Sequence, residues 1–111
     1  CCTVQNVVEA DGEVYPCDFY VLDPYKLGNL NKAGFEEIHQ KRLETGFLQS
    51  SLLKAPECQS CNWKNICRGG CRRDRDRFDG GELGLNYFCK SYRMFFEHSI
   101  ARLKELAYMR R

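Results

Sequence analysis

The residues of this 111-residue chain most able to do chemistry are its eight cysteines. Four stand in the run Cys58-x2-Cys61-x5-Cys67-x3-Cys71, and the other four are Cys1, Cys2, Cys17 and Cys89. So many cysteines in a short chain indicate disulfides, zinc or iron–sulfur clusters. Thiols separated by two residues are typical of metal ligands, and no signal peptide opens the chain. We therefore favour metal over disulfides and expect a reducing, cytoplasmic environment.

Two kinds of metal centre compete for these thiols. A [4Fe–4S] cluster needs four thiolates, and proximity alone would give it the whole run from Cys58 to Cys71. Zinc ribbons place about fifteen residues between their cysteine pairs, whereas only five lie between Cys61 and Cys67. The spacing favours iron–sulfur clusters. A zinc-stabilised binding module without a redox role is the alternative, and any single isolated cysteine could be an ordinary buried residue.

The surrounding sequence predicts the elements that must position the cysteines. Residues 3–9 are β-branched and polar and residues 13–20 read as a second strand, so with the turn signal at residues 10–12 between them they predict a hairpin. The hairpin would bring Cys2 and Cys17 together, with Pro16 at a sheet edge or a strand end. Residues 32–53 have helical spacing, with Asn31 as the expected N-cap and a break at Gly46. A long helix is expected from about residue 86 onward.

The fold class predicted is therefore α+β: a small N-terminal β-hairpin, short helices, a cysteine-rich metal-binding loop and a long C-terminal helix. Residues 57–81 contain little apolar material, so we expect a metal to order them. The mixed run 72–77 predicts a solvated, self-neutralising face. An apolar stripe on the last helix predicts a core contact rather than a cofactor site: Phe88, Tyr92, Phe95, Phe96, Ile100, Leu103, Leu106 and Ala107.

Charge and hydropathy exclude some partners. The net charge is only +2, which gives no electrostatic reason to expect nucleic acid. The sequence contains no apolar stretch near the eighteen or so residues of a membrane helix. We expect neither a nucleic-acid partner nor a membrane partner.

The order of the cysteines resembles a known family. Cys2-x9-Gly12-x4-Cys17, then the run from Cys58 to Cys71, then Cys89, is similar to the seven-cysteine motif of the SPASM domain. This is the C-terminal auxiliary-cluster domain of a group of radical S-adenosylmethionine (SAM) enzymes. Residues 14–20 and 67–72 look most like the anaerobic sulfatase-maturating enzymes, which convert a Cys or Ser of a sulfatase to formylglycine.

The resemblance implies two [4Fe–4S] clusters that share the cysteine run. The ligands of the outer cluster would be Cys58, Cys61, Cys67 and Cys89. The ligands of the inner cluster would be Cys2, Cys17 and Cys71, with a fourth cysteine upstream of the chain and Cys1 as a weak substitute.

The resemblance also implies a catalytic role for Asp18, as the general base that deprotonates the substrate. Residues 1–111 would be one domain of a longer radical SAM oxidoreductase. They would carry electrons away from the oxidised substrate and help to position the peptide. The expected partners are the radical SAM barrel of the same polypeptide, a sulfatase precursor peptide and an electron acceptor.

The SAM-binding Cys-x3-Cys-x2-Cys loop does not occur in residues 1–111. SAM would therefore bind only in a preceding domain, and the chain would not be active alone. A SPASM domain from a maturase of a different peptide is a further alternative.

Overall fold

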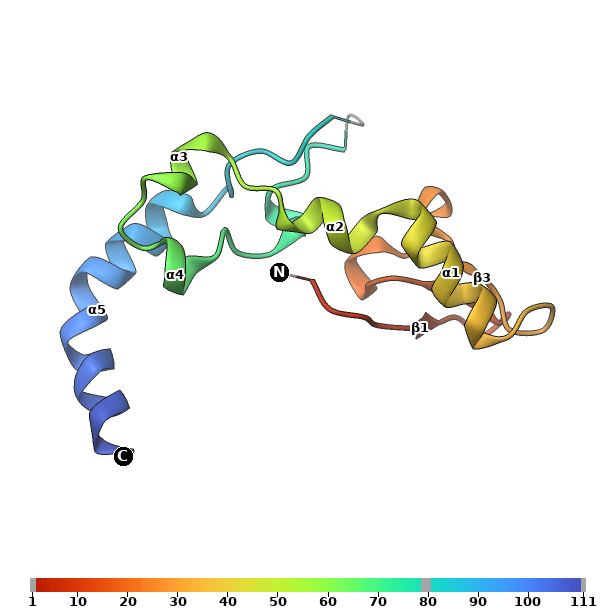
Figure 1. The fold of residues 1–111 in the computed structure, drawn as a ribbon, viewed down its shortest axis with the longest axis horizontal. Helices are drawn as coiled ribbons and strands as arrows, with labels where there is room; N and C mark the ends of the chain where they lie inside the picture. The colour runs from red at the N-terminus through yellow and green to blue at the C-terminus, as the bar shows by residue number, and fades with distance from the viewer. Residues whose placement is uncertain (1, 79–80, 111) are drawn as a thin grey trace. The chain divides into compact units, whose positions relative to one another are not determined.

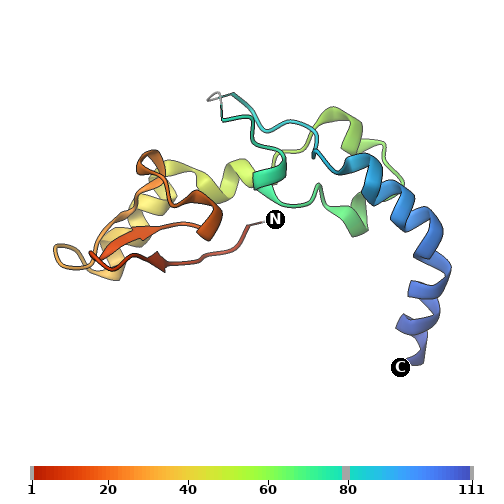
Figure 2. The ribbon, with the colours of Figure 1, turned by 180° about the vertical axis from the view of Figure 1, so that it is seen from behind.

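The computed structural model describes residues 2–78 and 81–110. Contacts divide the chain into two compact units, Cys1–Leu53 and Lys54–Arg111. Figure 1 and Figure 2 show the first unit with its strands and the helices α1 and α2, and the second with α3, α4 and α5. The elements belong to an α+β fold, as the sequence predicts.

The first unit is built on a three-stranded antiparallel sheet. Its strands are β1 (Val7–Val8), β2 (Glu13–Tyr15) and β3 (Gly28–Asn29), in the order β1-β2-β3. The predicted hairpin is confirmed, with shorter strands than expected. Strand β2 ends before Pro16, which has no N–H to donate to a ladder. Strand β3 lies in a segment that carried no strand signal.

The turn of the hairpin depends on Gly12, whose φ is +87°. A Cβ atom there would lie 2.6 Å from Nδ2 of Asn31. The amides of Asn29 and Asn31 both donate hydrogen bonds to the Asp11 carbonyl, at 3.1 and 2.9 Å. Only glycine combines this left-handed backbone with such a close approach, so Gly12 allows the turn to be tied to β3.

Two helices follow the sheet. Helix α1 (Phe35–Thr45) and helix α2 (Phe47–Leu52) are separated by Gly46 in the left-handed conformation, which confirms the predicted break. The prediction of Asn31 as the N-cap is wrong. The cap is Gly34, whose N–H donates to Oε2 of Glu37 at 2.7 Å. The side chain of Asn31 is already engaged with Asp11.

The core of the first unit is small. Val14, Leu27 and Ile38 pack together from the sheet and α1, while Tyr20 and Phe47 meet edge to face, 5.0 Å between ring centroids. The short 3₁₀ helices η1 (Asp18–Tyr20) and η2 (Asp23–Tyr25) complete this unit.

Arg42 ties α1 to the N-terminal segment. It is 2% exposed, and its guanidinium donates to the Gln5 carbonyl and to Oδ1 of Asn6. Burial lowers the pKa of Arg42 from its usual value. These hydrogen bonds compensate for removing the charge from water.

The second unit places short helices beside a long one. Its elements are α3 (Pro56–Gln59), α4 (Lys64–Cys67), the 3₁₀ helix η3 (Arg72–Asp74) and α5 (Cys89–Met109). Pro56 occupies the first turn of α3, where a missing N–H costs nothing.

Two sequence predictions for this unit are wrong. No residue of α5 is buried, and Phe95 is 55% exposed, so the apolar stripe does not form a core within the described residues. The run 72–77 is not a wholly solvated face, because Arg72 and Arg75 are only 8% and 3% exposed. The 3₁₀ turn points these two side chains inward, a conformation that charge pattern alone does not reveal.

A helix that spans a bilayer needs about 20 consecutive, mostly apolar residues. Within residues 2–78 and 81–110, no helix combines the length and apolar character needed to cross a bilayer.

Candidate metal centre

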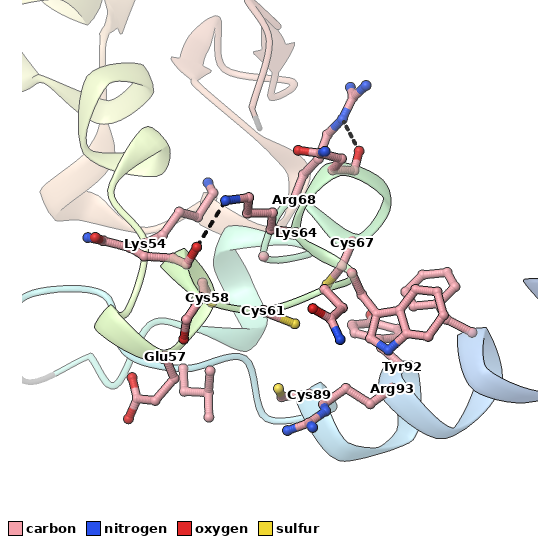
Figure 3. Close-up of a pocket in the computed structure, with 18 of the residues that line it drawn as sticks. Lys54, Glu57, Cys58, Cys61, Lys64, Cys67, Arg68, Cys89, Tyr92 and Arg93 are labelled. Carbon is pink, nitrogen blue, oxygen red and sulfur yellow. Dashed lines mark hydrogen bonds between the residues drawn. The ribbon is translucent and has the colours of Figure 1, made fainter.

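Four cysteines of the second unit surround one cavity of about 950 Å³. Cys58 lies on α3, Cys61 follows it, Cys67 ends α4 and Cys89 begins α5. Figure 3 shows the sulfur atoms of Cys61, Cys67 and Cys89 facing a common space. Three separate segments thus deliver thiols to one place, and Cys89 arrives there from 18 residues beyond the cysteine run (89 − 71).

The electrostatics of this group are those of interacting thiols. Burial raises the pKa of the Cys58 thiol above its ordinary value of 9.0. Negative charge on Cys89, Cys67 or Cys61 would raise it further. Because like charges placed close together disfavour each other, the four thiolates need a cation or a metal cluster among them to be ionised together.

The sulfur donors that line this cavity are four thiols. Among residues 2–78 and 81–110, no three Cys, His, Asp or Glu side chains are gathered closely enough to hold a single metal ion. A [4Fe–4S] cluster is a larger object held by four thiolates. Four thiols lining one cavity match the number of thiolates that such a cluster takes.

A glycine loop and a buried amide hold the cavity wall in place. Arg68, Gly69 and Gly70 all have positive φ, at 53°, 83° and 69°. The side-chain amide of Asn86, 5% exposed, donates to the Gly69 carbonyl at 3.1 Å. The Oδ1 atom of Asn86 accepts from the N–H of Phe88 at 2.8 Å. Asn86 therefore fixes the loop after Cys67 to the start of α5.

Cys2 and Cys17 both belong to the first unit, and the proximity that the hairpin predicts for them stays a prediction. Burial raises the pKa of Cys17, and a charge on Cys2 would raise it further. The Cys17 thiol also donates to Oδ1 of Asp18 at 3.3 Å, and Asp18 is exposed at the start of η1. A carboxylate thus lies directly beside a predicted cluster ligand.

The remaining predicted ligands lie elsewhere. Cys71 belongs to the second unit and is exposed, just before η3. Cys1 lies outside the described residues. The assignment of all these cysteines to two clusters stays a prediction.

A family model described as an iron–sulfur cluster-binding domain, SPASM, matches residues 1–62, more than half of the chain. The chain belongs to the SPASM family. The match ends within the cysteine run and begins at the predicted hairpin. It agrees with the resemblance that the cysteine order indicates.

Similar proteins indicate which kind of SPASM domain this chain is. A cysteine-type anaerobic sulfatase-maturating enzyme of Clostridium perfringens is 47% identical over 106 residues. The serine-type enzyme of Bacteroides thetaiotaomicron is 35% identical over 99 residues. The matches cover 96% and 87% of this chain, which itself spans only 29% and 24% of those two proteins. The chain is thus a SPASM domain of the kind found in anaerobic sulfatase-maturating enzymes.

Solved structures share the fold closely. A structure described as native anSMEcpe with bound AdoMet has a TM-score of 0.93 at 44% identity. The match covers 99% of this chain and 30% of that one. The same protein with bound AdoMet and Kp18Cys peptide has a TM-score of 0.90 at 46% identity. That match covers 96% of this chain and 30% of the other.

Sequence reasoning did not assign three residues to the cysteine cavity or its wall. Asn86 ties the glycine loop to α5, while Tyr92 and Phe96 line the cysteine cavity. Phe96 lies 5.7 Å from Trp63 between ring centroids. The positions of Tyr92 and Phe96, three and seven residues after Cys89, place them on the face that carries this cysteine. That spacing was the available signal.

Proposed function

We propose that this SPASM domain holds two [4Fe–4S] clusters and serves as the auxiliary-cluster domain of a radical SAM sulfatase-maturating enzyme. The observation that carries the proposal is the cavity around Cys58, Cys61, Cys67 and Cys89. These four would bind the outer cluster. When bound, such clusters supply one-electron redox centres whose potentials depend on burial and on hydrogen bonds to sulfur.

The ligands proposed for the inner cluster are Cys2, Cys17 and Cys71, with a fourth from outside the described residues. Cys2 and Cys17 lie in the same unit, and a charge on Cys2 would raise the pKa of Cys17, which supports the assignment of these two. The assignment of Cys71 rests on the family motif. Each thiol would lose its proton on binding iron, so loading either site releases protons.

Asp18 is the proposed general base. It is exposed, and it touches the Cys17 thiol. Once Cys17 is a deprotonated ligand, its sulfur no longer donates to the Asp18 carboxylate. The carboxylate can then accept a proton from another donor beside the centre. A carboxylate in this position can take a proton from a substrate bound next to the cluster.

The proposed reaction is formation of formylglycine from Cys or Ser in a sulfatase peptide. One similar structure contains a peptide together with AdoMet, which supports a peptide substrate. The radical SAM barrel of the same polypeptide would bind SAM and begin the oxidation. Residues 1–111 would help to position the peptide and would pass electrons to an external acceptor. Asp18 would act as the general base.

The test uses the full polypeptide that contains this domain, purified without oxygen. It is incubated with SAM, a reductant and a sulfatase peptide that contains the target Cys or Ser, and the product is identified by mass spectrometry. Asp18→Asn is expected to abolish formylglycine formation with unchanged iron content. Asp23→Asn is the matched control, since Asp23 is also exposed at the start of a 3₁₀ helix.

The outcomes separate the parts of the proposal. Full activity of Asp18→Asn would refute the role of the base. An iron-loaded protein that leaves both Cys and Ser sulfatase peptides unchanged would refute sulfatase maturation and point to a different peptide. A protein without iron would refute the cluster assignment itself.

A further inference from the structure

Tyr92 lies in the first turn of α5 and lines the cysteine cavity. It follows Cys89 by three residues, so both side chains project from the same face of the helix. Its side chain lines the cavity that Cys58, Cys61, Cys67 and Cys89 surround, as Figure 3 shows. Neither the family motif nor the proposed function assigns it a task.

The ring of Tyr92 also lies against the segment that joins Cys67 to Cys71. A Cβ atom on Gly70 would lie 3.1 Å from Cε2 of Tyr92. The absence of a side chain at Gly70 is what allows the ring to approach the backbone there. Gly70 is the residue directly before Cys71, and only Arg68 and Gly69 separate it from Cys67.

The phenolic O–H of Tyr92 can donate a hydrogen bond. Burial raises the pKa of Tyr92 above its ordinary 10.0, and the negative charges of Asp74, Cys67 and Cys71 raise it further. The ring lines the same cavity as Cys67, and it lies against Gly70, the residue directly before Cys71. Tyr92 is half-buried, and thiolate sulfur beside its ring is the acceptor that cluster binding would create here.

These two thiols are assigned to different clusters under the proposed function, on which this inference rests. Cys67 would belong to the outer cluster and Cys71 to the inner one. We propose that the Tyr92 hydroxyl is a hydrogen-bond donor to the cluster thiolates of the Cys67–Cys71 segment, and that it raises the reduction potential of at least one cluster. A donor favours the reduced, more negatively charged state, because hydrogen bonds to sulfur stabilise added negative charge.

The test is an EPR-monitored redox titration of the full, cluster-loaded polypeptide. Tyr92→Phe removes the hydroxyl and keeps the ring against Gly70. We expect the iron content to stay unchanged and one midpoint potential to fall by a tenfold change in the reduction equilibrium, about 59 mV for a one-electron couple. Tyr87→Phe is the matched control: Tyr87 is 84% exposed, and only its backbone N–H bonds to Asp74.

Four results would overturn the inference. Unchanged potentials in an iron-loaded Tyr92→Phe variant would show that the hydroxyl does not act on either cluster. An equal shift in Tyr87→Phe would show a general effect of losing a phenol near α5. Loss of iron in Tyr92→Phe would assign the residue a structural role instead. A wild-type protein without iron would overturn the proposed function, and this inference with it.

Discussion

The adjacent residues Gly69 and Gly70 have similar backbones and very different neighbours. Both have positive φ, so an alanine at either position adopts a left-handed conformation that costs about 1 kcal/mol. A Cβ atom on Gly69 would meet Cδ of Lys54 at 2.9 Å, which is part of a flexible side chain that can move away. A Cβ atom on Gly70 would lie 2.5 Å from Nδ2 of Asn86.

Asn86 cannot move away from a new Cβ atom without losing a buried hydrogen bond. It is 5% exposed, and the same Nδ2 atom donates to the Gly69 carbonyl. Displacing it breaks a buried hydrogen bond worth about 1 kcal/mol, and overpacking adds roughly 1–3 kcal/mol. With the backbone strain, Gly70→Ala should lower the local opening free energy by about 3–5 kcal/mol. Gly69→Ala should lower it by only about 1 kcal/mol.

Native-state hydrogen exchange of the peptides that cover residues 64–92 measures this difference. Since each 1.4 kcal/mol is about a factor of ten in an opening equilibrium, exchange should accelerate by two to three and a half powers of ten, roughly, in Gly70→Ala. In Gly69→Ala the acceleration should be about fivefold. Equal acceleration in the two variants would refute the reasoning, because it would leave only the shared backbone strain.

Three further outcomes are expected. Cys89→Ala removes one ligand of the cavity, so iron analysis should find about four fewer irons per chain; an unchanged count would take Cys89 out of the site. In the metal-free chain the pKa values of Cys17 and Cys58 are raised above 9.0, so the unfolded thiols ionise first and stability should fall as the pH rises through about 9. A urea midpoint that increases between about pH 8 and pH 10 would contradict this sign. Arg42→Ala should lower the free energy of unfolding by about 3 kcal/mol in urea titrations, because a buried side chain is removed and the Gln5 carbonyl and Asn6 lose their charged donor; a loss equal to that of an exposed-site variant would show that the bonds contribute nothing.

The cysteine chemistry could be predicted from the sequence, but its geometry could not. Thiol spacing indicates a metal centre, and the family motif pairs Cys89 with the run. Proximity in sequence would have placed Cys71 with Cys58, Cys61 and Cys67. The structure instead has Cys89 beside the cavity, because Asn86 bonds the start of α5 to the Gly69 carbonyl. A single asparagine before a helix carries no sequence signal of that contact.

The fold was predicted where periodicity or turn chemistry is strong. Gly12 marks the hairpin and Gly46 marks the helix break, since each has a left-handed backbone. Strand β3 was missed because two residues, Gly28 and Asn29, are too few to show alternation. The burial of Arg75 was missed because charge runs are ordinarily solvated.

Helix α5 shows a different limit of sequence reasoning. Its apolar stripe has clear helical spacing, and this predicts a buried face. The helix is present, yet none of its residues is buried within the described chain. Two members of the stripe, Tyr92 and Phe96, line the cysteine cavity instead. Periodicity thus identified the helix and the face that matters, but not what that face contacts.

The central claim is that the cysteines hold two iron–sulfur clusters. Iron and acid-labile sulfide analysis of the anaerobically purified full polypeptide, with Cys58 and Cys17 each replaced by alanine in turn, tests it most directly. After subtraction of the SAM-binding cluster, the wild type should contain about eight irons per chain, and each variant about four fewer. A colourless protein with stoichiometric zinc, or an iron content that neither substitution changes, would contradict the claim.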